Sequence, residues 1–342
     1  MKKFHNNNDN FLFSHKDLLL MTGSILILLV ALCASIFIGN DSVRAGELIN
    51  ALFGGGKGTS AELILYKVRI PRALAALFCG GGLAVAGLLL QLTLNNTLAS
   101  PGVLGINAGA GFFVLLAGLV FPYSVAAKQL SAFLGALLTA LFVYGISYKA
   151  GVSKTTLILS GVAVSSLFAA GSNTIITIFP SAVTDKNAFS LGGLSGATGI
   201  AVAVTCLMII AGTIFSLILS RGIGLFSLGD EVAAGLGLNI NLYRLLAIIC
   251  AAFISAAAVS VCGLISFVGL LVPNLVRMIT KPRTLANIFL CFFAGGILLL
   301  ICDTLARQLF YPYELPVGLF LSFLGAPFFI YILIVKRRRL SL

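Results

Sequence analysis

Side chains that could do chemistry are scarce in this chain and therefore informative. Its 342 residues include ten Asp and Glu, 22 Lys and Arg, and two His. Two of the acids, Asp230 and Glu231, stand together in FSLGDEVAAGLGLNI (226–240), between two long apolar stretches. Ser227 lies three residues before Asp230, a spacing that fits a capping box, and carboxylates in a first turn favour the helix dipole. The spacing predicts a short acidic helix.

The other residues of this short helix decide what its surface can do. Val232 and Leu236, at i and i+4, give one apolar face, and the Ala and Gly residues leave the rest nearly bare. One interpretation is an amphipathic helix lying on lipid, but such helices favour Lys and Arg on the polar face. A small acidic helix is better shaped to enter a groove on another protein.

Catalytic and metal-binding constellations are missing from the sequence. Both His, His5 and His15, lie in the polar N-terminal tail, so no histidine is left to act as a base within the apolar segments. The seven Cys all fall in apolar stretches without a C-x-x-C pair, which predicts neither a disulfide nor a metal site. GGGKGTS (54–60) lacks the order of a phosphate-binding loop. We expect no cofactor on this chain, so any ATP that drives it must be bound by another subunit.

The composition places these residues in a membrane. Hydrophobic residues make up 59% of the chain, charged residues 9%, and the mean hydropathy is +1.11. The net charge of +12 is scattered among loops, whereas a nucleic-acid surface needs a basic stripe. We expect an all-α polytopic membrane protein with about ten transmembrane helices. The apolar runs are 18–38, 72–92, 103–121, 128–148, 155–178, 198–219, 243–264, 284–302 and 316–335, with a shorter one at 266–279.

An even number of spans puts both termini on one side, and the positive-inside rule favours the cytoplasm, with one loop dissenting. The expected organisation is a cytoplasmic tail (1–17), one transmembrane domain (18–335) and a basic cytoplasmic tail (336–342). The first span is too long for the apolar region of a secretory signal, so we expect a retained helix. The acidic helix then belongs to a cytoplasmic segment, 221–241, between the sixth and seventh spans.

Two further polar features stand out. Arg69 and Arg72 flank Pro71 at the start of the second span, and Arg307 follows the ninth. They are interpreted either as side chains that snorkel to lipid phosphate or as a docking point for an anionic partner outside the cell. Gly, Pro and Asn residues also interrupt 88–111 and 262–279, which indicates either kinked helices or an internal repeat around a pathway.

Eight short motifs occur in order along the chain. They are R-x-P-R (69–72), G-x-x-x-Q (87–91), N-x-L-A-x-P-x-x-L-G (96–105), L-G-D-E-x-A-x-x-L-G (228–237), G-x-I-x-F-V-G-L-x-x-P (263–273), D-T-L-A-R (303–307), E-L-P-V-G (314–318) and G-A-P-F-F (325–329). Together they resemble the permease subunits of type II ATP-binding-cassette (ABC) importers, which carry ferric siderophores, haem or cobalamin into bacteria. The resemblance runs from about residue 15 to the C-terminus.

The resemblance implies an assembly in the bacterial plasma membrane. It implies a second permease, identical or paralogous, two ATPase subunits that bind ATP and Mg, and an extracytoplasmic substrate-binding protein. The residues that would contact the ATPase are Leu228, Gly229, Asp230, Glu231, Ala233, Leu236 and Gly237. The arginines that would meet glutamates of the binding protein are Arg69, Arg72 and Arg307. The residues that would line the pathway are Gln91, Asn96, Ser165, Ser166 and Asn173.

The sequence departs from the family pattern at two places. Asn95, Asn96 and Thr97 stand where the family often has Arg-Asn-Pro, and Asn274 stands where it often has His after Pro273.

The cargo and one rival function are not decided by these motifs. An iron-siderophore chelate is the expected cargo because it is the commonest in the family, with haem or cobalamin as alternatives. An ion-coupled secondary transporter would need ionisable residues at the midplane, and Asp303 is the only acid near a span.

Overall fold

The fold is described from a computed structural model of the whole chain. It describes residues 15–39, 43, 45–52, 58–150, 153–180, 183–197, 199–280, 283–309 and 313–340. Most of the expected N-terminal tail, with His5, lies outside the described residues, as does GGGK of the glycine-rich loop. Residues 15–17 already belong to the first helix, and the last helix continues to Leu340.

Helices are the regular elements of the described residues, which contain no strand. The long helices are α1 (His15–Phe37), α4 (Ile70–Thr93), α5 (Ile106–Val120), α6 (Val125–Lys149), α7 (Lys154–Ile178), α9 (Gly199–Leu225), α11 (Ile240–Cys262), α12 (Val268–Ile279), α13 (Thr284–Gln308) and α14 (Val317–Leu340). The short ones are α2 (Ala45–Leu52), α3 (Ser60–Ile64), η1 (Leu65–Arg69), η2 (Pro101–Leu104), α8 (Val183–Leu191), η4 (Phe226–Leu228) and α10 (Asp230–Gly235).

The expected membrane spans are all present as helices. Within the described residues, seven helices are long and apolar enough to cross a membrane, and three shorter apolar helices, α5, α12 and the first part of α14, accompany them. The expectation of an all-α protein with about ten membrane helices is confirmed. At 1.5 Å per residue, however, the 12 residues of α12 reach only about 18 Å, less than the hydrocarbon thickness.

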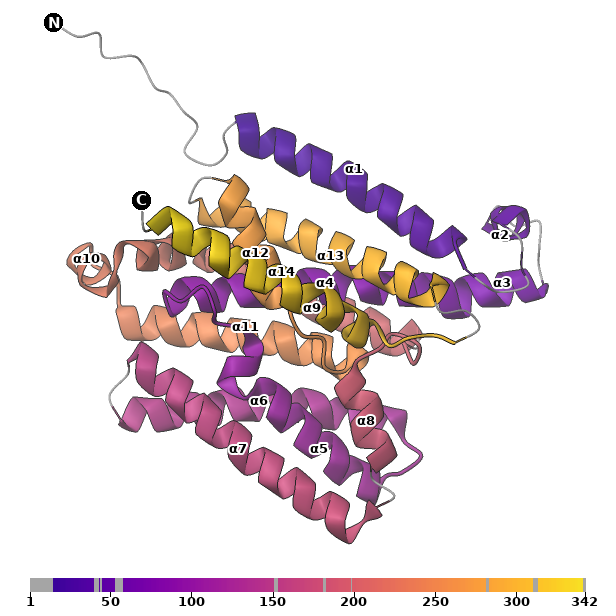
Figure 1. The fold of residues 1–342 in the computed structure, drawn as a ribbon, viewed down its shortest axis with the longest axis horizontal. Coiled ribbons are helices and arrows are strands. Elements are labelled where there is room, and N and C mark those ends of the chain that lie inside the picture. The colour runs from indigo at the N-terminus through magenta and orange to yellow at the C-terminus, as the bar shows by residue number, and fades with distance from the viewer. Residues whose placement is uncertain are drawn as a thin grey trace, which may run out of the picture.

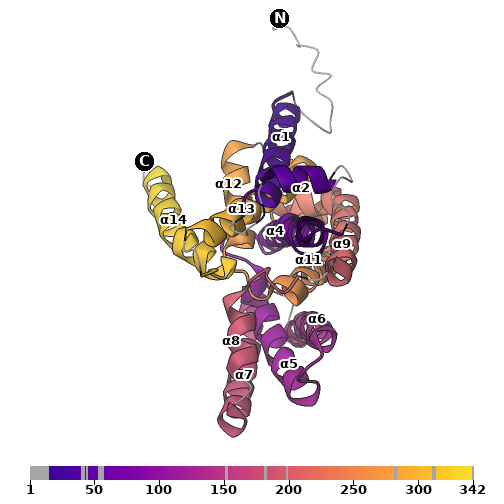
Figure 2. The same cartoon turned by 90° about the vertical axis from the view of Figure 1, so that its right-hand side faces the viewer.

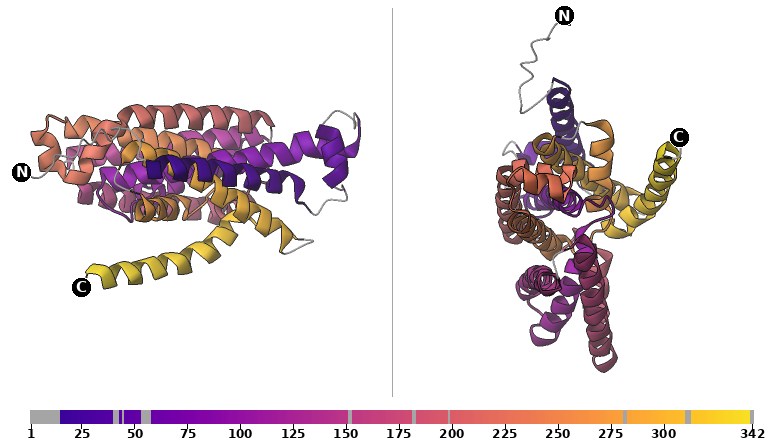
Figure 3. Two further views of the ribbon diagram at one scale, coloured as in Figure 1. Left: turned by 90° about the horizontal axis from the view of Figure 1, so that it is seen from above. Right: turned by 90° about the vertical axis from the view of Figure 1, so that its left-hand side faces the viewer.

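The helices run roughly parallel, so the bundle has two ends (Figure 1). α10, the start of α1 and the end of α14 lie at one end, which we call the α10 end (Figures 1 and 3). α2 and α3 lie at the other, the α3 end (Figure 1). The structure therefore places the described ends of the chain and the acidic segment on the same side of the bundle.

Helix α4 is the centre of the bundle. Figure 2 shows it end-on, enclosed by α1, α9, α11 and α13. Small residues allow this: a Cβ added to Gly80 would meet the backbone of Gly295 on α13, and one added to Gly295 would lie 2.6 Å from Ala84 Cβ. The small-residue spacing of α4 thus brings two helix backbones into contact, where dispersion and packing hold them together.

The start of α4 differs from the expectation. The sequence predicts that a helix begins at about residue 72, near Pro71, but α3, η1 and α4 form one helical stretch over Ser60–Thr93. The turn before Pro71 is a π-turn, Leu65–Arg69. A π-turn accommodates the missing N–H of proline, so the helix continues through it. Arg69 and Arg72 are therefore not at a helix start.

Two parts of the bundle stand away from α4. Helices α5 to α8 form a group on one side, and α14 leans outward on another (Figure 2). Only 22% of the most apolar window of α7 is buried, and Leu159, Val162 and Leu167 on this helix are exposed. These exposed apolar faces are suited to lipid or to a further subunit.

Candidate transport sites

The acidic segment forms a compact projection at the α10 end. Gly229 (φ 97°) precedes α10 and Gly237 (φ 86°) follows it, and both conformations favour glycine. A Cβ added to Gly229, Gly235 or Gly237 would meet nothing within 4 Å. The two flanking glycines therefore serve the turns, while Gly235 leaves part of the surface bare.

The capping box expected around Ser227 is wrong. Gly229 is the N-cap of α10 and makes no side-chain cap, while Ser227 Oγ donates to Gly224 O at 2.7 Å. A capping box needs the hydroxyl to reach the third helical residue. Here Ser227 belongs instead to the 3-10 turn η4, which separates it from α10.

Asp230 points back into the protein. Its carboxylate contacts Arg244 Nη2 at 2.8 Å and Lys154 Nζ at 3.4 Å. Arg244 is itself buried, with its guanidinium 5.6 Å from the centroid of the buried Phe226 ring. The carboxylate thus ties α10 to the starts of α7 and α11.

The exposed surface of η4 and α10 is mostly apolar, with one exposed acidic side chain. Leu228 is 56% exposed and Leu236 63% exposed, and Glu231 is also exposed. Ala233 is fully buried, so its side chain packs under the helix and does not reach the surface. Asp230 and Ala233 therefore hold the projection in place, while Leu228, Glu231, Val232 and Leu236 lie on its accessible face.

The arginines at the α3 end are buried, which the sequence does not predict. Asp303 is 1% exposed and its carboxylate contacts both Arg72 Nε, at 3.1 Å, and Arg307 Nε, at 3.3 Å. Arg72 Nη1 also contacts Glu314 at 2.8 Å, and that side chain is 54% exposed. Arg69 donates to the Ile36 and Phe37 carbonyls at 2.8 and 3.2 Å. These arginines join α4 to α13, α1 and the segment before α14.

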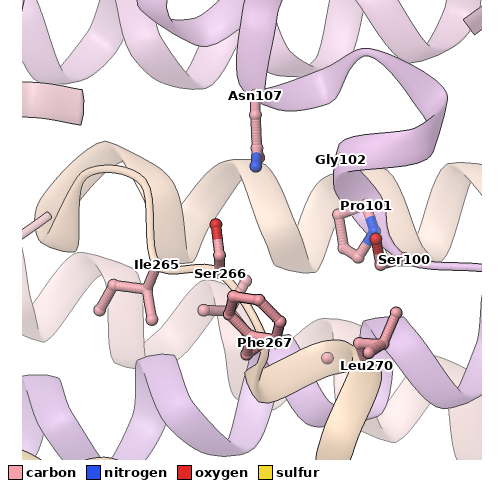
Figure 4. Close-up of a pocket in the computed structure, with 10 residues that line it drawn as sticks. Ser100, Pro101, Gly102, Asn107, Ile265, Ser266, Phe267 and Leu270 are labelled. Atoms are coloured by element: carbon pink, nitrogen blue, oxygen red, sulfur yellow. The ribbon is translucent and has the colours of Figure 1, made fainter. Parts of the chain in front are cut away.

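The two interrupted segments meet inside the protein. α4 ends at Thr93 and α5 begins only at Ile106; α11 ends at Cys262 and α12 begins at Val268. Between them lies a cavity of about 250 Å³, shown in Figure 4. Its lining is Leu83, Ser100, Pro101, Gly102, Asn107, Ile265, Ser266, Phe267, Gly269 and Leu270. Leu83 is near the middle of α4, so the cavity lies at the mid-depth of the bundle.

None of these cavity residues belongs to the expected pathway set. Ser100 and Ser266 lie on opposite sides of the cavity, with Asn107 above them in Figure 4. The interruptions in the sequence point to both segments but not to their meeting. Phe267 has φ 70°, an unusual conformation for a bulky residue that no sequence signal announces.

The expected pathway residues are separated by the fold. Gln91 is buried and donates to the Gly269 and Leu270 carbonyls, both at 3.3 Å, so it joins α4 to α12. Asn96 accepts from Leu98 N and forms a local turn. Ser165 is half-buried on α7 near Gly105, Ser166 is exposed, and the exposed Asn173 accepts from Lys186 at 3.3 Å. These five residues do not form one site within the subunit.

Comparison with known proteins agrees with this architecture. The sequence profile of the FecCD transport family matches residues 27–335. This chain belongs to the FecCD transport family. Of its relatives, the iron(3+)-hydroxamate import system permease protein FhuG of Bacillus subtilis is 34% identical, with 94% of this chain and 98% of FhuG aligned. The Fe(3+)-citrate import system permease protein YfmD of the same organism is also 34% identical, over 93% and 95%.

A solved structure supports the same assignment for this FecCD-family chain. A metal-chelate type ABC transporter in an inward-facing conformation matches with a TM-score of 0.81 and 25% identity, covering 93% of this chain and 99% of the other. The FecCD-family chain is therefore a multi-pass membrane protein and the permease subunit of an ABC importer. No group of three His, Cys, Asp or Glu that could hold a metal ion occurs in the described part of the chain.

Proposed function

We propose that this permease imports an iron-siderophore-type chelate, together with a second permease subunit, two ATPase subunits that bind ATP and Mg, and a substrate-binding protein. The projection at the α10 end carries the proposal, because its exposed leucines offer an apolar surface suited to a partner protein and the ion pairs of Asp230 join it to α7 and α11. The hydroxamate and citrate cargoes of its relatives support a ferric chelate as cargo. Haem or cobalamin import remains the alternative within the family.

The proposed orientation puts the α10 end in the cytoplasm of a bacterial cell. Lys149 and Lys154 flank the turn between α6 and α7, and Arg277 and Arg283 flank the turn between α12 and α13, all at this end. Basic residues concentrate on the cytoplasmic side of membrane proteins. The exposed apolar faces of α7 and α14 are where we place the second permease, so that the pathway lies between the two subunits.

A substitution on the exposed face of the α10 projection tests the ATPase contact without changing the residues that hold the projection in place. We expect Leu236→Asp to abolish co-purification of the ATPase and uptake of radioactive iron supplied as ferric hydroxamate or ferric citrate. Leu236 is exposed, so the variant should fold, whereas an added carboxylate in an apolar groove costs about 2 kcal/mol or more. Asn241→Asp, an exposed residue on the neighbouring α11, is the matched control. Full ATPase binding by Leu236→Asp would contradict the proposed coupling role.

The binding protein is proposed to dock at the α3 end. The arginines of this permease are buried there, so docking requires one of them to exchange its present partner. Arg72 has an accessible carboxylate partner, because the Glu314 side chain is 54% exposed. A glutamate of the binding protein would have to take the place of Glu314 on Arg72. Glu314 then competes with the glutamate of the binding protein for Arg72.

If Glu314 competes for Arg72, removing its charge should strengthen the binding of the binding protein. If Arg72 had only a structural role, the same change would not strengthen that binding. We expect Glu314→Gln to strengthen capture of the binding protein by up to about fivefold, because a surface ion pair worth up to about 1 kcal/mol no longer has to be broken. The measurement is binding-protein affinity in nanodiscs. An unchanged or weaker affinity would show that Arg72 does not dock. Glu62→Gln, at the same end on α3, is the control for net charge.

A further inference from the structure

A second cavity lies at the α10 end, where residues of both interrupted segments, 88–111 and 262–279, line it together with residues of η4 and α13. Its volume is about 250 Å³, below the roughly 300 Å³ at which sites for drug-sized ligands begin. It is therefore too small for a ferric chelate. Its lining is Gln91, Leu92, Asn95, Ser227, Arg277, Thr280, Thr284 and Asn287, a set in which Leu92 is the single apolar side chain.

Arg277 supplies positive charge to this cavity without a matching negative one. Its guanidinium donates to the Pro273 carbonyl at 3.2 Å, to Asn274 Oδ1 at 3.4 Å and to Gln91 Oε1, all neutral acceptors. Within the described part of the chain, no carboxylate lies within the 4 Å that would make an ion pair with it. A partly buried cation is normally compensated by an anion, so an acceptor is missing here.

Asn287 gives an independent indication of a ligand. The residue is only 2% exposed, and its Oδ1 accepts from Thr280 Oγ1 at 2.7 Å. Its amide nitrogen, which carries two N–H donors, makes no hydrogen bond to any described residue, although the side chain lines the cavity. Since this side chain lines the cavity, its amide nitrogen can donate to an oxygen of a bound ligand.

The neighbouring elements add donors of the same kind. α13 begins at Thr284, which lines the cavity, and the N–H groups of a first helical turn have no acceptor within the helix. Ser227 comes from η4, which leads directly into the α10 projection. Guanidinium, amide and hydroxyl donors around a small cavity form a set that favours a phosphate group, whose oxygens can accept from each of them.

We infer that this cavity binds a phosphate group at the α10 end, held by Arg277, Asn287 and Thr284. The same chemistry is offered by the headgroup of an anionic phospholipid and by free inorganic phosphate. Because Ser227 precedes α10, the bound group would brace α4, α12 and α13 against the base of the ATPase-facing projection. The site depends only on this chain's residues, so a failure of the proposed cargo or docking would leave it unaffected.

The test uses the full chain purified free of lipid in detergent. One arm titrates inorganic phosphate by calorimetry, and the other compares phosphatidylglycerol with diacylglycerol, which lacks the phosphate, by native mass spectrometry. We expect Arg277→Gln to weaken binding by about tenfold or more, since hydrogen bonds from a charged donor are the strong ones. Thr284→Val keeps the charge and shape and should weaken it by about threefold.

Arg283→Gln is the matched control, because Arg283 stands at the same turn but pairs with Asp17 at 2.9 Å and does not line the cavity. It should leave binding unchanged. Saturable binding of phosphatidylglycerol alone identifies a lipid site, and binding of inorganic phosphate identifies a site for the free ion. The inference is overturned if the wild-type chain binds neither, or if Arg277→Gln and Arg283→Gln lose the same affinity.

Discussion

Replacing Asp303 with Asn should destabilise this permease by about 3–5 kcal/mol, because it removes the negative partner of a buried charge cluster. Asp303 is 1% exposed and serves Arg72 and Arg307 together. Without that charge, Arg307 keeps neutral partners: the Asp303 carbonyl at 3.4 Å, and the carbonyl and hydroxyl of Ser35 at 3.1 and 3.3 Å. We expect the α3 ends of α4 and α13 to separate.

The measurement is thermal unfolding in detergent, followed by circular dichroism. Glu314→Gln is the internal control, since it removes a carboxylate from the same Arg72 at a half-exposed position and should cost no more than about 1 kcal/mol. Equal losses for the two variants would show that burial does not set the strength of this cluster. The result also guides docking experiments, because charge reversal at Arg72 would unfold the α3 end before it tested any partner.

Replacing Gly87 with Ala should disrupt the contact between α4 and α12 and abolish transport. A Cβ at Gly87 would lie 2.6 Å from Gly269 Cα and would overlap the Gly269 carbonyl. Both are backbone atoms, so the contact cannot be relieved by a rotamer change, and overpacking of this kind costs about 1–3 kcal/mol or more. The hydrogen bonds from Gln91 to the Gly269 and Leu270 carbonyls would stretch with it.

Gly145→Ala is the control for this substitution. Gly145 lies inside α6, and a Cβ there would meet nothing within 4 Å. Because alanine has the higher helix propensity, the control should be neutral or stabilising by up to about 1 kcal/mol. Unfolding midpoints and iron uptake of both variants are the measurements. Normal uptake by Gly87→Ala would show that α12 can move away from α4 without loss of function.

The local features that the sequence predicted well are those carried by neighbouring residues. The apolar runs predicted the membrane helices because about 20 apolar residues can satisfy their backbone in lipid only as a helix. The acidic helix was predicted at 226–240 and lies there as η4 and α10. Its capping box was not found, because the spacing of Ser227 and Asp230 is compatible with a cap but does not exclude a 3-10 turn between them.

The predicted helix start near Pro71 is wrong for a related reason. Proline after a polar stretch is typical of a first helical turn, but a π-turn can absorb its missing N–H when the preceding residues are also packed as helix. Leu65, the first residue of that turn, is fully buried in a small cluster with Leu48, Ala51 and Ala61. That packing accompanies the extension of the helix to Ser60, and two of its members, Leu48 and Ala51, lie 20 or more positions before Pro71.

The sequence by itself determined a membrane-embedded helical permease of the FecCD transport family, because composition and the order of motifs do not depend on contacts between distant residues. Only the tertiary structure decided what the polar residues do. Contacts between Arg72 and Asp303, or between Arg277 and Gln91, join positions about 190 to 230 residues apart. In a medium that does not solvate charge, the energy of each polar side chain depends on which distant partner the packing supplies, so its role follows from the fold.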